Sequence, residues 1–273
     1  MITKEDINSL ISREIERAGF DEKLCGIVKY VFSTGGKRLR PLMFLEAYSF
    51  GGGEITEAIE KFAVAIECLH QYTLIHDDLP CMDNDKLRRG QPSCHAKYGE
   101  TFALLAGDAL LNYSYTLMFD AIKLSGYDRS FVDAAHAFSV LSGGAGVIGG
   151  QFLEFSSQQP KVDVFDVYRR KTAYLMWGAI YAGATIAKLS QKKIVALNEF
   201  AFNYGFCFQI CDDLADLTEK GSVEEYSIVG LYGADKARGI CKKAGENAIN
   251  SLVMSDINSD FFTELVNKSV GEL

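Results

Sequence analysis

Two aspartate clusters are the groups in this sequence best suited to do chemistry. The first, DDLPCMDND, covers residues 77–85, and the second, DDLAD, covers residues 212–216. Carboxylates this close together repel one another unless cations neutralise them. Carboxylate oxygens are hard ligands that suit Mg²⁺, which fills its remaining coordination positions with water and phosphate. The two clusters therefore predict a site that holds several Mg²⁺ ions around a diphosphate.

Basic residues alternate with these clusters along the chain. Lys37 and Arg40 lie about one helical turn apart in GGKRLRP. Arg88 and Arg89 follow the first cluster, and RRKT at 169–172 precedes the second. Arginine can bind phosphate oxygens in a bidentate manner, and lysine acts as a point charge. Any one of these groups is more often surface charge or helix-end charge, so the prediction depends on their alternation with the aspartates.

The spacing within each cluster is compatible with shared metal ligands. Asp212 and Asp216 stand at positions i and i+4, which puts both on one face of a helix. On a straight helix Asp77 and Asp83 would be separated by a rotation of about 240°. Pro80 gives the helix a reason to end, which lets Asp83 fold back toward Asp77. The alternative for any single aspartate is a solvated acidic turn.

The elements that must position these residues are helices. Apolar residues recur at spacings of three and four along five long segments, at residues 54–76, 101–124, 131–155, 163–189 and 192–217. Breaks that contain glycine or proline separate the segments, and no clear run of alternating β-branched residues occurs between them. The pattern predicts an all-α bundle of roughly ten helices.

A short internal similarity links the two acidic clusters. The pattern I-x-D-D-L occurs at residues 75–79 and again at residues 210–214, each time at the end of a long apolar helix. It is no solenoid repeat, because it occurs twice and far apart. It predicts that two helices present carboxylates into one deep central cavity of the bundle.

The bulk composition fits a single domain that spans residues 1–273. The chain is 48% hydrophobic, and no linker or low-complexity run divides it. Its net charge of −8 argues against a nucleic-acid partner. The seven cysteines form no CxxC pair and lie mostly in apolar runs, which indicates reduced thiols. With no signal-peptide pattern and no run of about 18 apolar residues, we expect a cytoplasmic protein without a membrane span.

Taken together, the motifs resemble those of the trans-isoprenyl diphosphate synthases, the polyprenyl synthetase family. The similar segments are GGKRLRP, HDDLPCMDNDKLRRGQPSCH, GGQFLEF, RKT and FQICDDLAD, in the family's order between residues 35 and 216. The form DDLPCMD is similar to that of the bacterial farnesyl diphosphate synthases. The resemblance implies the isoprenoid synthase fold and a Mg²⁺-dependent prenyltransferase. Such an enzyme joins isopentenyl diphosphate head to tail with dimethylallyl or geranyl diphosphate, and it gives farnesyl diphosphate and pyrophosphate.

The resemblance also implies roles for individual residues. The residues that would bind the isopentenyl diphosphate headgroup are Lys37, Arg40, His70 and Arg89. Those that would hold the allylic diphosphate are Arg88, Lys171, Thr172, Gln209 and Lys220. Those that would ligate three Mg²⁺ ions, or Mn²⁺ in their place, are Asp77, Asp78, Asp83, Asp212 and Asp216. Asp77, Asp83, Asp212 and Lys171 are the expected catalytic residues, and a homodimer is the expected assembly.

Product length is expected to depend on Tyr72. This residue precedes Asp77 by about 7.5 Å along a helix, so its ring can form a floor beneath the growing hydrocarbon. In the family, an aromatic residue at this place accompanies short products. The alternative is a core residue that points elsewhere, because the rotation from Asp77 is about 140°. In that case Thr73 is the next candidate.

The chain departs from the family pattern at three places. Glu154 stands where the family usually has aspartate, and Tyr168 stands where it often has histidine. The loop after the second cluster, residues 217–227, is shorter than the family's loop and keeps one lysine, Lys220. We therefore expect either a loose closure over the allylic diphosphate or another segment that supplies the missing charge.

Related functions remain as alternatives. A geranylgeranyl or geranyl diphosphate synthase differs in product length. A terpene cyclase shares the fold and the first motif, but it normally carries an Asn/Ser/Glu metal motif in place of the second DDxxD. A regulatory subunit of a heteromeric synthase commonly lacks the aspartates that are intact here. A membrane-embedded prenyltransferase would need membrane spans.

Overall fold

The computed structural model describes residues 2–156, 163–221 and 225–271, without the side chains of residues 219 and 220. This part of the chain contains fourteen α-helices, one π-helical turn and one hairpin of two very short strands, so the prediction of an all-α protein is confirmed. The chain divides into two compact units. The first consists of residues 1–45 and 54–132, and the second of residues 46–53 and 133–273. A single domain over the whole chain stays a prediction.

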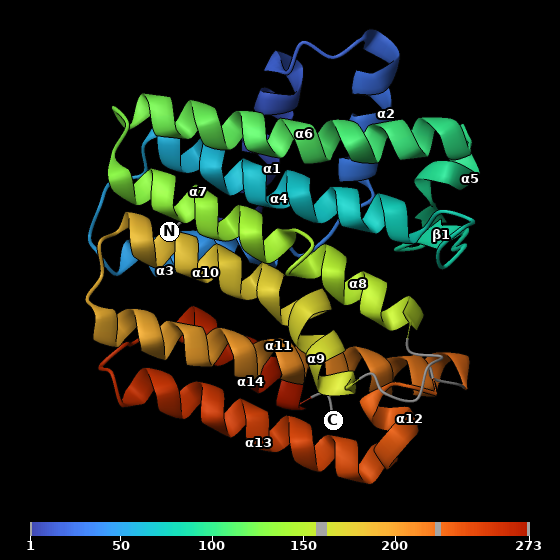
Figure 1. The fold of residues 1–273 in the computed structure, drawn as a ribbon, viewed down its shortest axis with the longest axis vertical. Helices are drawn as coiled ribbons and strands as arrows, with labels where there is room; N and C mark the ends of the chain where they lie inside the picture. The colour runs from blue at the N-terminus through green and yellow to red at the C-terminus, as the bar shows by residue number, and fades with distance from the viewer. Residues whose placement is uncertain (1, 157–162, 222–224, 272–273) are drawn as a thin grey trace. The chain divides into compact units, whose positions relative to one another are not determined.

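The first unit is built around one buried helix. Its elements are α1 (Lys4–Arg17), α2 (Glu22–Ser33), α4 (Glu57–Asp77), β1 (Leu87–Arg88), β2 (Gln91–Pro92), α5 (Cys94–Tyr98) and α6 (Glu100–Leu124). The α4 helix packs along α6, as Figure 1 shows. Phe62, Ile66 and Leu69 of α4 are fully enclosed. A helix that is apolar on nearly every side belongs in the centre of a unit.

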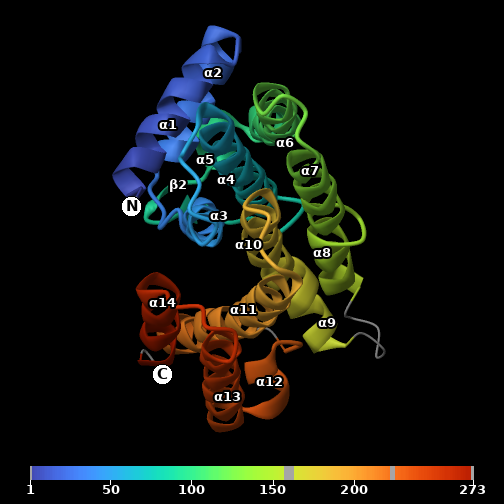
Figure 2. The ribbon, with the colours of Figure 1, turned by 90° about the vertical axis from the view of Figure 1, so that its left-hand side faces the viewer.

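The second unit is built around α11. Its elements are α8 (Val147–Ser156), α9 (Val164–Tyr168), the π-helix η1 (Arg169–Ala173), α10 (Tyr174–Ile186), α11 (Gln191–Lys220), α12 (Ile228–Tyr232), α13 (Ala234–Val253) and α14 (Asp260–Gly271). Ser190 caps the start of α11, and Gly221 ends it in the left-handed conformation, with φ of 70°. The α10, α13 and α14 helices pack against α11 (Figure 2). Two further helices, α3 (Leu39–Ser49) and α7 (Arg129–Ser142), belong partly to each unit.

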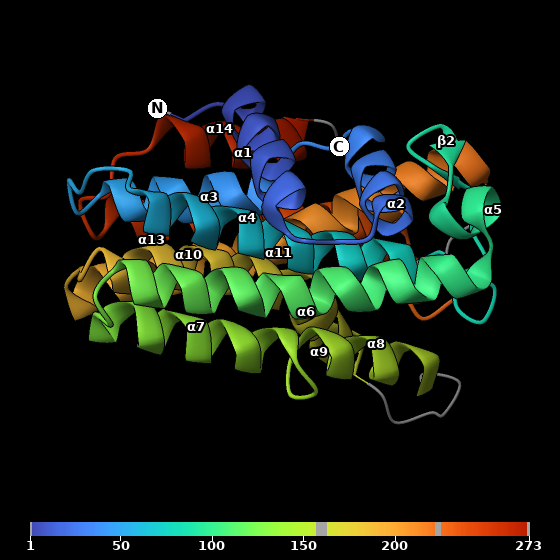
Figure 3. The same ribbon diagram turned by 90° about the horizontal axis from the view of Figure 1, so that it is seen from above.

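The single helix predicted over residues 131–155 is wrong. The chain forms α7, then a turn at residues 143–146, then α8, and Figure 3 shows the turn between the two helices. A Cβ atom at Gly146 would lie 1.7 Å from the carbonyl oxygen of Leu141, so the turn requires glycine there. The helix predicted over 163–189 likewise contains the π-helical turn, and the small hairpin was not predicted at all. Helices at 54–76, 101–124 and 192–217 are confirmed as α4, α6 and α11.

Residues 129–156 are apolar and long enough, by composition alone, to be considered for a membrane span, and 39% of the apolar stretch is buried in the protein. The turn at 143–146 divides this segment into helices of 14 and 10 residues. Their lengths are about 21 and 15 Å, which is short of the roughly 30 Å of a bilayer core. Length and composition at this segment are therefore weak support for a membrane span.

A buried ion pair ties the GGKRLRP segment to α4. Arg38 donates to Glu67 Oε1 at 3.0 Å, and the two side chains are only 2% and 1% exposed. Arg38 also donates to Asn8 Oδ1 at 2.9 Å and to the Phe32 carbonyl at 2.6 Å. Gln71 donates to the same Glu67 oxygen. Removing one partner of such a pair leaves a buried charge without compensation.

We predict that Glu67→Ala lowers the free energy of unfolding by about 3–5 kcal/mol, because Arg38 then remains buried and unpaired. Urea unfolding followed by circular dichroism measures this change. The control is Glu16→Ala, which breaks the exposed Lys29–Glu16 pair and should leave the stability nearly unchanged. Equal losses in the two variants would contradict the structural role of the buried pair.

Candidate functional site

Two glycines of the GGKRLRP segment allow the side chain of Arg89 to approach the backbone closely. Gly35 and Gly36 have φ of 95° and 126°, a region that residues with a side chain rarely adopt. A Cβ atom on Gly36 would lie 2.6 Å from Nη1 of Arg89. The same guanidinium donates a hydrogen bond to the Gly35 carbonyl. These glycines therefore let a cation from the β1–β2 hairpin rest directly on the backbone of this loop.

Positive charge gathers around His70 on α4. Arg40 Nη1 lies 3.1 Å from His70 Nε2, and because arginine can only donate, Nε2 is the acceptor. Burial, followed by the charges of Arg40 and Arg89, holds the pKa of His70 well below its usual range. The ring is therefore neutral and carries its proton on Nδ1, which is buried and has no hydrogen-bond partner among the described residues. A buried donor beside several cations is the environment expected of an anion site.

The four residues predicted for the isopentenyl headgroup all lie in the first unit. Arg40 and Arg89 lie close to His70 of α4. Lys37 lies three residues before Arg40 in the sequence, and its side chain is exposed. Burial, and then the charge of Arg38, lowers the pKa of Arg89. The cations thus raise one another's energy, and a bound anion would relieve that repulsion.

The first acidic cluster begins where α4 ends. Asp77 is the last residue of the helix and Asp78 caps it. The N–H of Asp83 donates to the Asp77 carbonyl at 2.9 Å, so the chain folds back as the proline predicts. The side chain of Asp77 is half-buried and that of Asp83 is exposed. Both carboxylates come from one tight turn, which fits ligands of a shared cation.

Asp78 differs from its neighbour, because its carboxylate is engaged by Arg88. Arg88 Nε lies 3.0 and 3.3 Å from the two carboxylate oxygens, and Nη2 makes a further contact with one of them. Asp78 is 2% exposed, and burial raises its pKa while Arg88 opposes that rise. The hairpin turn at Arg89 and Gly90, both with positive φ, presents Arg88 to this carboxylate. In this arrangement Asp78 and Arg88, predicted to bind metal and allylic diphosphate respectively, bind each other.

Tyr72 lies on α4 and is 5% exposed. Its ring packs edge-on against the ring of His76, with centroids 5.6 Å apart. A Cβ atom at Gly107 of α6 would lie 2.1 Å from His76 Nε2, so glycine is required for α6 to accommodate that ring. Thr73 is half-buried, and its hydroxyl donates to the His70 carbonyl at 2.8 Å. Tyr72 is thus a fixed, buried ring one turn below the acidic cluster.

In the second unit, glycines bring the π-helix η1 close to two other helices. A Cβ atom on Gly150 of α8 would lie 2.4 Å from the Lys171 backbone nitrogen, and one on Gly205 of α11 would lie 2.5 Å from Ala173 Cβ. The π-helical turn therefore packs backbone to backbone on both sides, and such turns often occur at functional sites. It carries Lys171 and Thr172, two residues predicted to hold the allylic diphosphate.

A hydrogen-bond chain connects η1 with the second acidic cluster. The Thr172 hydroxyl donates to Gln209 Oε1 at 2.6 Å, and Gln209 Nε2 donates to Asp213 Oδ1 at 3.1 Å. The Tyr168 hydroxyl donates to the other Asp213 oxygen and accepts the N–H of Ile228 at 2.8 Å. Burial and the charge of Asp213 raise the pKa of Tyr168, which keeps its proton available for that bond.

The remaining predicted residues of this unit surround that chain. Lys171 forms an ion pair with Glu154 of α8. Asp212 is exposed and Asp216 half-buried, one turn apart on α11. The side chain of Lys220 lies outside the described residues.

The two I-x-D-D-L segments share an arrangement that the sequence reading missed. The first aspartate of each pair, Asp77 or Asp212, is the more exposed one, and the second is bound by fixed donors. Asp213 was not among the predicted site residues, although its place in the repeated pattern matches that of Asp78. The signal was therefore present in the repeat itself.

The donor set fits Mg²⁺. The more exposed carboxylate of each pair offers hard oxygen ligands, the second aspartate is bound by donors of the protein, and cations lie nearby in each unit. Such a set can bind a diphosphate through metal ions and through direct charge-assisted hydrogen bonds.

Comparison with known proteins extends these observations. The family model described as polyprenyl synthetase matches residues 21–237. The farnesyl diphosphate synthase of Escherichia coli (strain K12) is 37% identical over 216 residues, which cover 77% of this chain and 72% of that protein. The geranylgeranyl diphosphate synthase of Cyanophora paradoxa is 34% identical over 221 residues, which cover 78% and 72%.

A solved structure shows the same fold. The geranyltransferase of Helicobacter pylori, complexed with magnesium and isoprenyl diphosphate, superposes with a TM-score of 0.78 at 29% identity. The alignment covers 99% of this chain and 98% of that one. The isoprenoid synthase fold predicted from the motifs is therefore confirmed.

We predict a specific pH dependence at His70. Its pKa is lowered by folding, so below the ordinary value of 6.5 the unfolded chain binds the extra proton and stability is lost as pH falls. His70→Gln keeps an acceptor for Arg40 and removes this titration. The free energy of unfolding should then fall less steeply between about pH 7 and pH 5 than in the unmodified protein.

The control is His136→Gln, because the side chain of His136 is exposed. Urea unfolding at a series of pH values gives both slopes. If His70→Gln and the unmodified protein lose stability in parallel, the neutral state of the His70 ring is contradicted.

Proposed function

Because this chain belongs to the polyprenyl synthetase family, we propose that it joins isopentenyl diphosphate head to tail with allylic diphosphates. It is a prenyltransferase of the farnesyl diphosphate synthase type. The observation that carries the proposal is the matched pair of I-x-D-D-L segments, each with an anchored second aspartate and an outward first one. A terpene cyclase would lack the second of these segments.

The isopentenyl diphosphate headgroup is proposed to bind at the cations of the first unit. Arg40, Arg89 and the buried Nδ1–H of His70 converge near α4 and supply donors for phosphate oxygens. Lys37, which is exposed, adds a further point charge. These contacts would hold the nucleophilic double bond in a fixed orientation, which is the main contribution that binding makes to such a reaction.

The allylic diphosphate is proposed to bind through metal ions and the residues of η1. Asp212 and Asp216, which belong to the same unit as η1, would hold Mg²⁺ there. Asp77 and Asp83 are proposed as Mg²⁺ ligands of the first unit, with three ions per chain in all and Mn²⁺ as a substitute. Bound Mg²⁺ supplies charge neutralisation that makes pyrophosphate a good leaving group. Lys171 and the Thr172 hydroxyl would contact the diphosphate oxygens, and Glu154 restrains the position of Lys171.

The roles of Asp78, Arg88 and Lys220 follow from their surroundings. Arg88 fixes Asp78, so both are proposed to orient the first cluster rather than to act separately. Lys220 keeps its predicted role at the allylic diphosphate. Ile228 directly follows the short loop, and its N–H donates to the Tyr168 hydroxyl. Because Tyr168 also donates to Asp213, it connects this residue with the second cluster.

Farnesyl diphosphate is the proposed product. Geranylgeranyl diphosphate is the alternative, because one relative is named as a geranylgeranyl diphosphate synthase. The observation that favours the shorter product is the buried ring of Tyr72, packed against His76 on the helix that ends in Asp77. A rigid ring at this level would stop the hydrocarbon after two additions.

A homodimer is the proposed assembly. Large apolar side chains stay exposed on α6, with Leu105 at 53%, Phe119 at 69% and Leu124 at 50%. Exposed apolar groups repeated along one helix are typical of an interface. We expect light scattering to give twice the mass of the chain and Phe119→Glu to give a monomer, whereas a monomeric unmodified protein would contradict the proposal.

The metal requirement is directly testable. Asp77→Ala, Asp83→Ala and Asp212→Ala should each lower kcat by several orders of magnitude, because the leaving group loses metal-held stabilisation. The assay is incubation of labelled isopentenyl diphosphate and geranyl diphosphate with Mg²⁺, followed by product analysis. Asp235→Ala, at a fully exposed carboxylate of α13, is the control and should keep its activity. Full activity in EDTA would refute the mechanism.

Product length provides an independent test. Tyr72→Ala should release products of C20 or longer while keeping the first condensation, because the floor is removed but the acidic cluster is not. Tyr72→Phe is the matched control, since it keeps the ring and should still stop at farnesyl diphosphate. Chromatography of the dephosphorylated products measures both. An unchanged product in Tyr72→Ala would move the floor to Thr73 or to a facing helix.

A further inference from the structure

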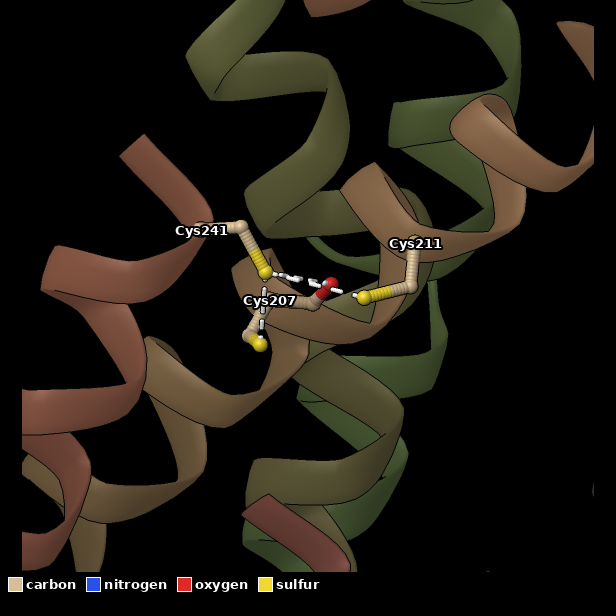
Figure 4. Close-up of side chains that lie close together, drawn as sticks. All are labelled: Cys207, Cys211 and Cys241. Carbon is tan, nitrogen blue, oxygen red and sulfur yellow. Dashed lines mark hydrogen bonds between the residues drawn. The ribbon is translucent and has the colours of Figure 1, made fainter. Parts of the chain in front are cut away.

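Three cysteines of the second unit meet at one point. Cys207 and Cys211 stand one turn apart on α11, and Cys241 lies opposite them on α13. Figure 4 shows the three side chains directed toward one another. All three sulfur atoms lie within 4.8 Å of one another. This convergence is a property of helix packing, because the cysteines of the two helices are far apart in the sequence.

The contacts within the cluster are close. Cys241 Sγ lies 2.8 Å from Cys207 Sγ and 3.6 Å from Cys211 Sγ. The Cys211 thiol also points at the Ser269 carbonyl at 3.2 Å, and the Cys241 thiol at the Cys207 carbonyl at 3.4 Å. Cys207 and Cys241 are fully buried, whereas Cys211 is half-buried. Cys211 is therefore the member of the cluster that is most exposed to solvent.

The surroundings determine which ion this cluster suits. Its neighbours in the core are apolar, among them Ile210, Ala237 and Ala244. Within the described part of the chain, no histidine, aspartate or glutamate adds a ligand atom to the three sulfurs. Hard cations prefer oxygen, and structural Zn²⁺ almost always takes four protein ligands. Three sulfur ligands without a fourth side chain favour a soft monovalent cation such as Cu(I).

We propose that Cys207, Cys211 and Cys241 form a three-sulfur site for one Cu(I) ion that links α11 to α13. With metal–sulfur distances of about 2.3 Å, a trigonal site places its sulfurs about 4 Å apart. In the structure Cys211 Sγ is already 3.6 Å from Cys241 Sγ, whereas Cys207 Sγ and Cys241 Sγ, 2.8 Å apart, would have to separate to bind the ion. Each thiol that binds as a thiolate loses its proton to solvent, and no electron is transferred.

The three-cysteine site is adjacent in the sequence to residues proposed for the prenyltransferase reaction, but it shares no residue with them. Cys211 immediately precedes Asp212, and Cys207 lies two residues before Gln209. A cation shared by the two helices restrains the part of α11 that carries the second acidic cluster. The oxygen ligands proposed for Mg²⁺ are not used, so the soft-cation site and the prenyltransferase activity can be tested separately.

The test is an anaerobic titration of the reduced full-length protein with Cu(I), in competition with bicinchoninate. We expect one tightly held ion per chain in the unmodified protein and none in Cys207→Ala or Cys241→Ala. The matched control is Cys68→Ala, which removes a fully buried thiol of α4 outside the cluster and should keep the ion. X-ray absorption of the loaded protein should show sulfur ligands only.

Thermal unfolding shows whether the core variants still fold. Cu(I) should raise the Tm of the unmodified protein and of Cys68→Ala, because a ligand bound only by the folded state stabilises it. It should not raise the Tm of Cys211→Ser, a change at the half-buried position. The same tight ion in all variants, nitrogen or oxygen ligands in the absorption spectrum, or a Cys207–Cys241 disulfide in the anaerobically reduced protein would overturn the proposal.

Discussion

Repulsion between neighbouring carboxylates is the constraint on which the functional parts of this protein depend. Each I-x-D-D-L segment puts two acidic side chains on adjacent residues. The fold holds the second of each pair with fixed donors, Arg88 for Asp78 and Tyr168 with Gln209 for Asp213. In each pair one carboxylate is held by hydrogen bonds, and the neighbouring one is the more exposed. Groups fixed in advance need little rearrangement when charge develops during a reaction.

The cations depend on a second constraint, which is the close approach of backbones. Gly36 admits the guanidinium of Arg89, and Gly150 and Gly205 admit η1 between α8 and α11. A larger residue at Gly36 would collide with the Arg89 guanidinium, and one at Gly150 or Gly205 would collide with η1. The glycines of GGKRLRP and GGQFLEF thus act through the space they leave open, and the ion pairs and hydrogen bonds act through the side chains placed in that space.

Two departures from the family pattern have counterparts in the structure. Glu154 is bonded to Lys171, so the longer acidic side chain still reaches the cation of η1. Tyr168 joins Asp213 to the Ile228 N–H, and Ile228 stands where the chain returns after the shortened loop. A neutral phenol can donate to the carboxylate and accept from the amide at the same time. One side chain therefore connects the second cluster to the segment that follows it.

The sequence by itself determined the helical class, the position of α4, α6 and α11, and the two acidic clusters, because apolar periodicity and residue type are local properties. It also predicted the turn that brings Asp83 back to Asp77, since Pro80 acts on its own helix. Only the tertiary structure decided that α7 ends before α8, where Gly146 approaches a carbonyl, and that Arg88 binds Asp78. The convergence of Cys241 with Cys207 was decided in the same way. Apolar periodicity predicts helices but does not predict which side chains meet. These contacts could therefore be assigned only once the packing of the elements was known.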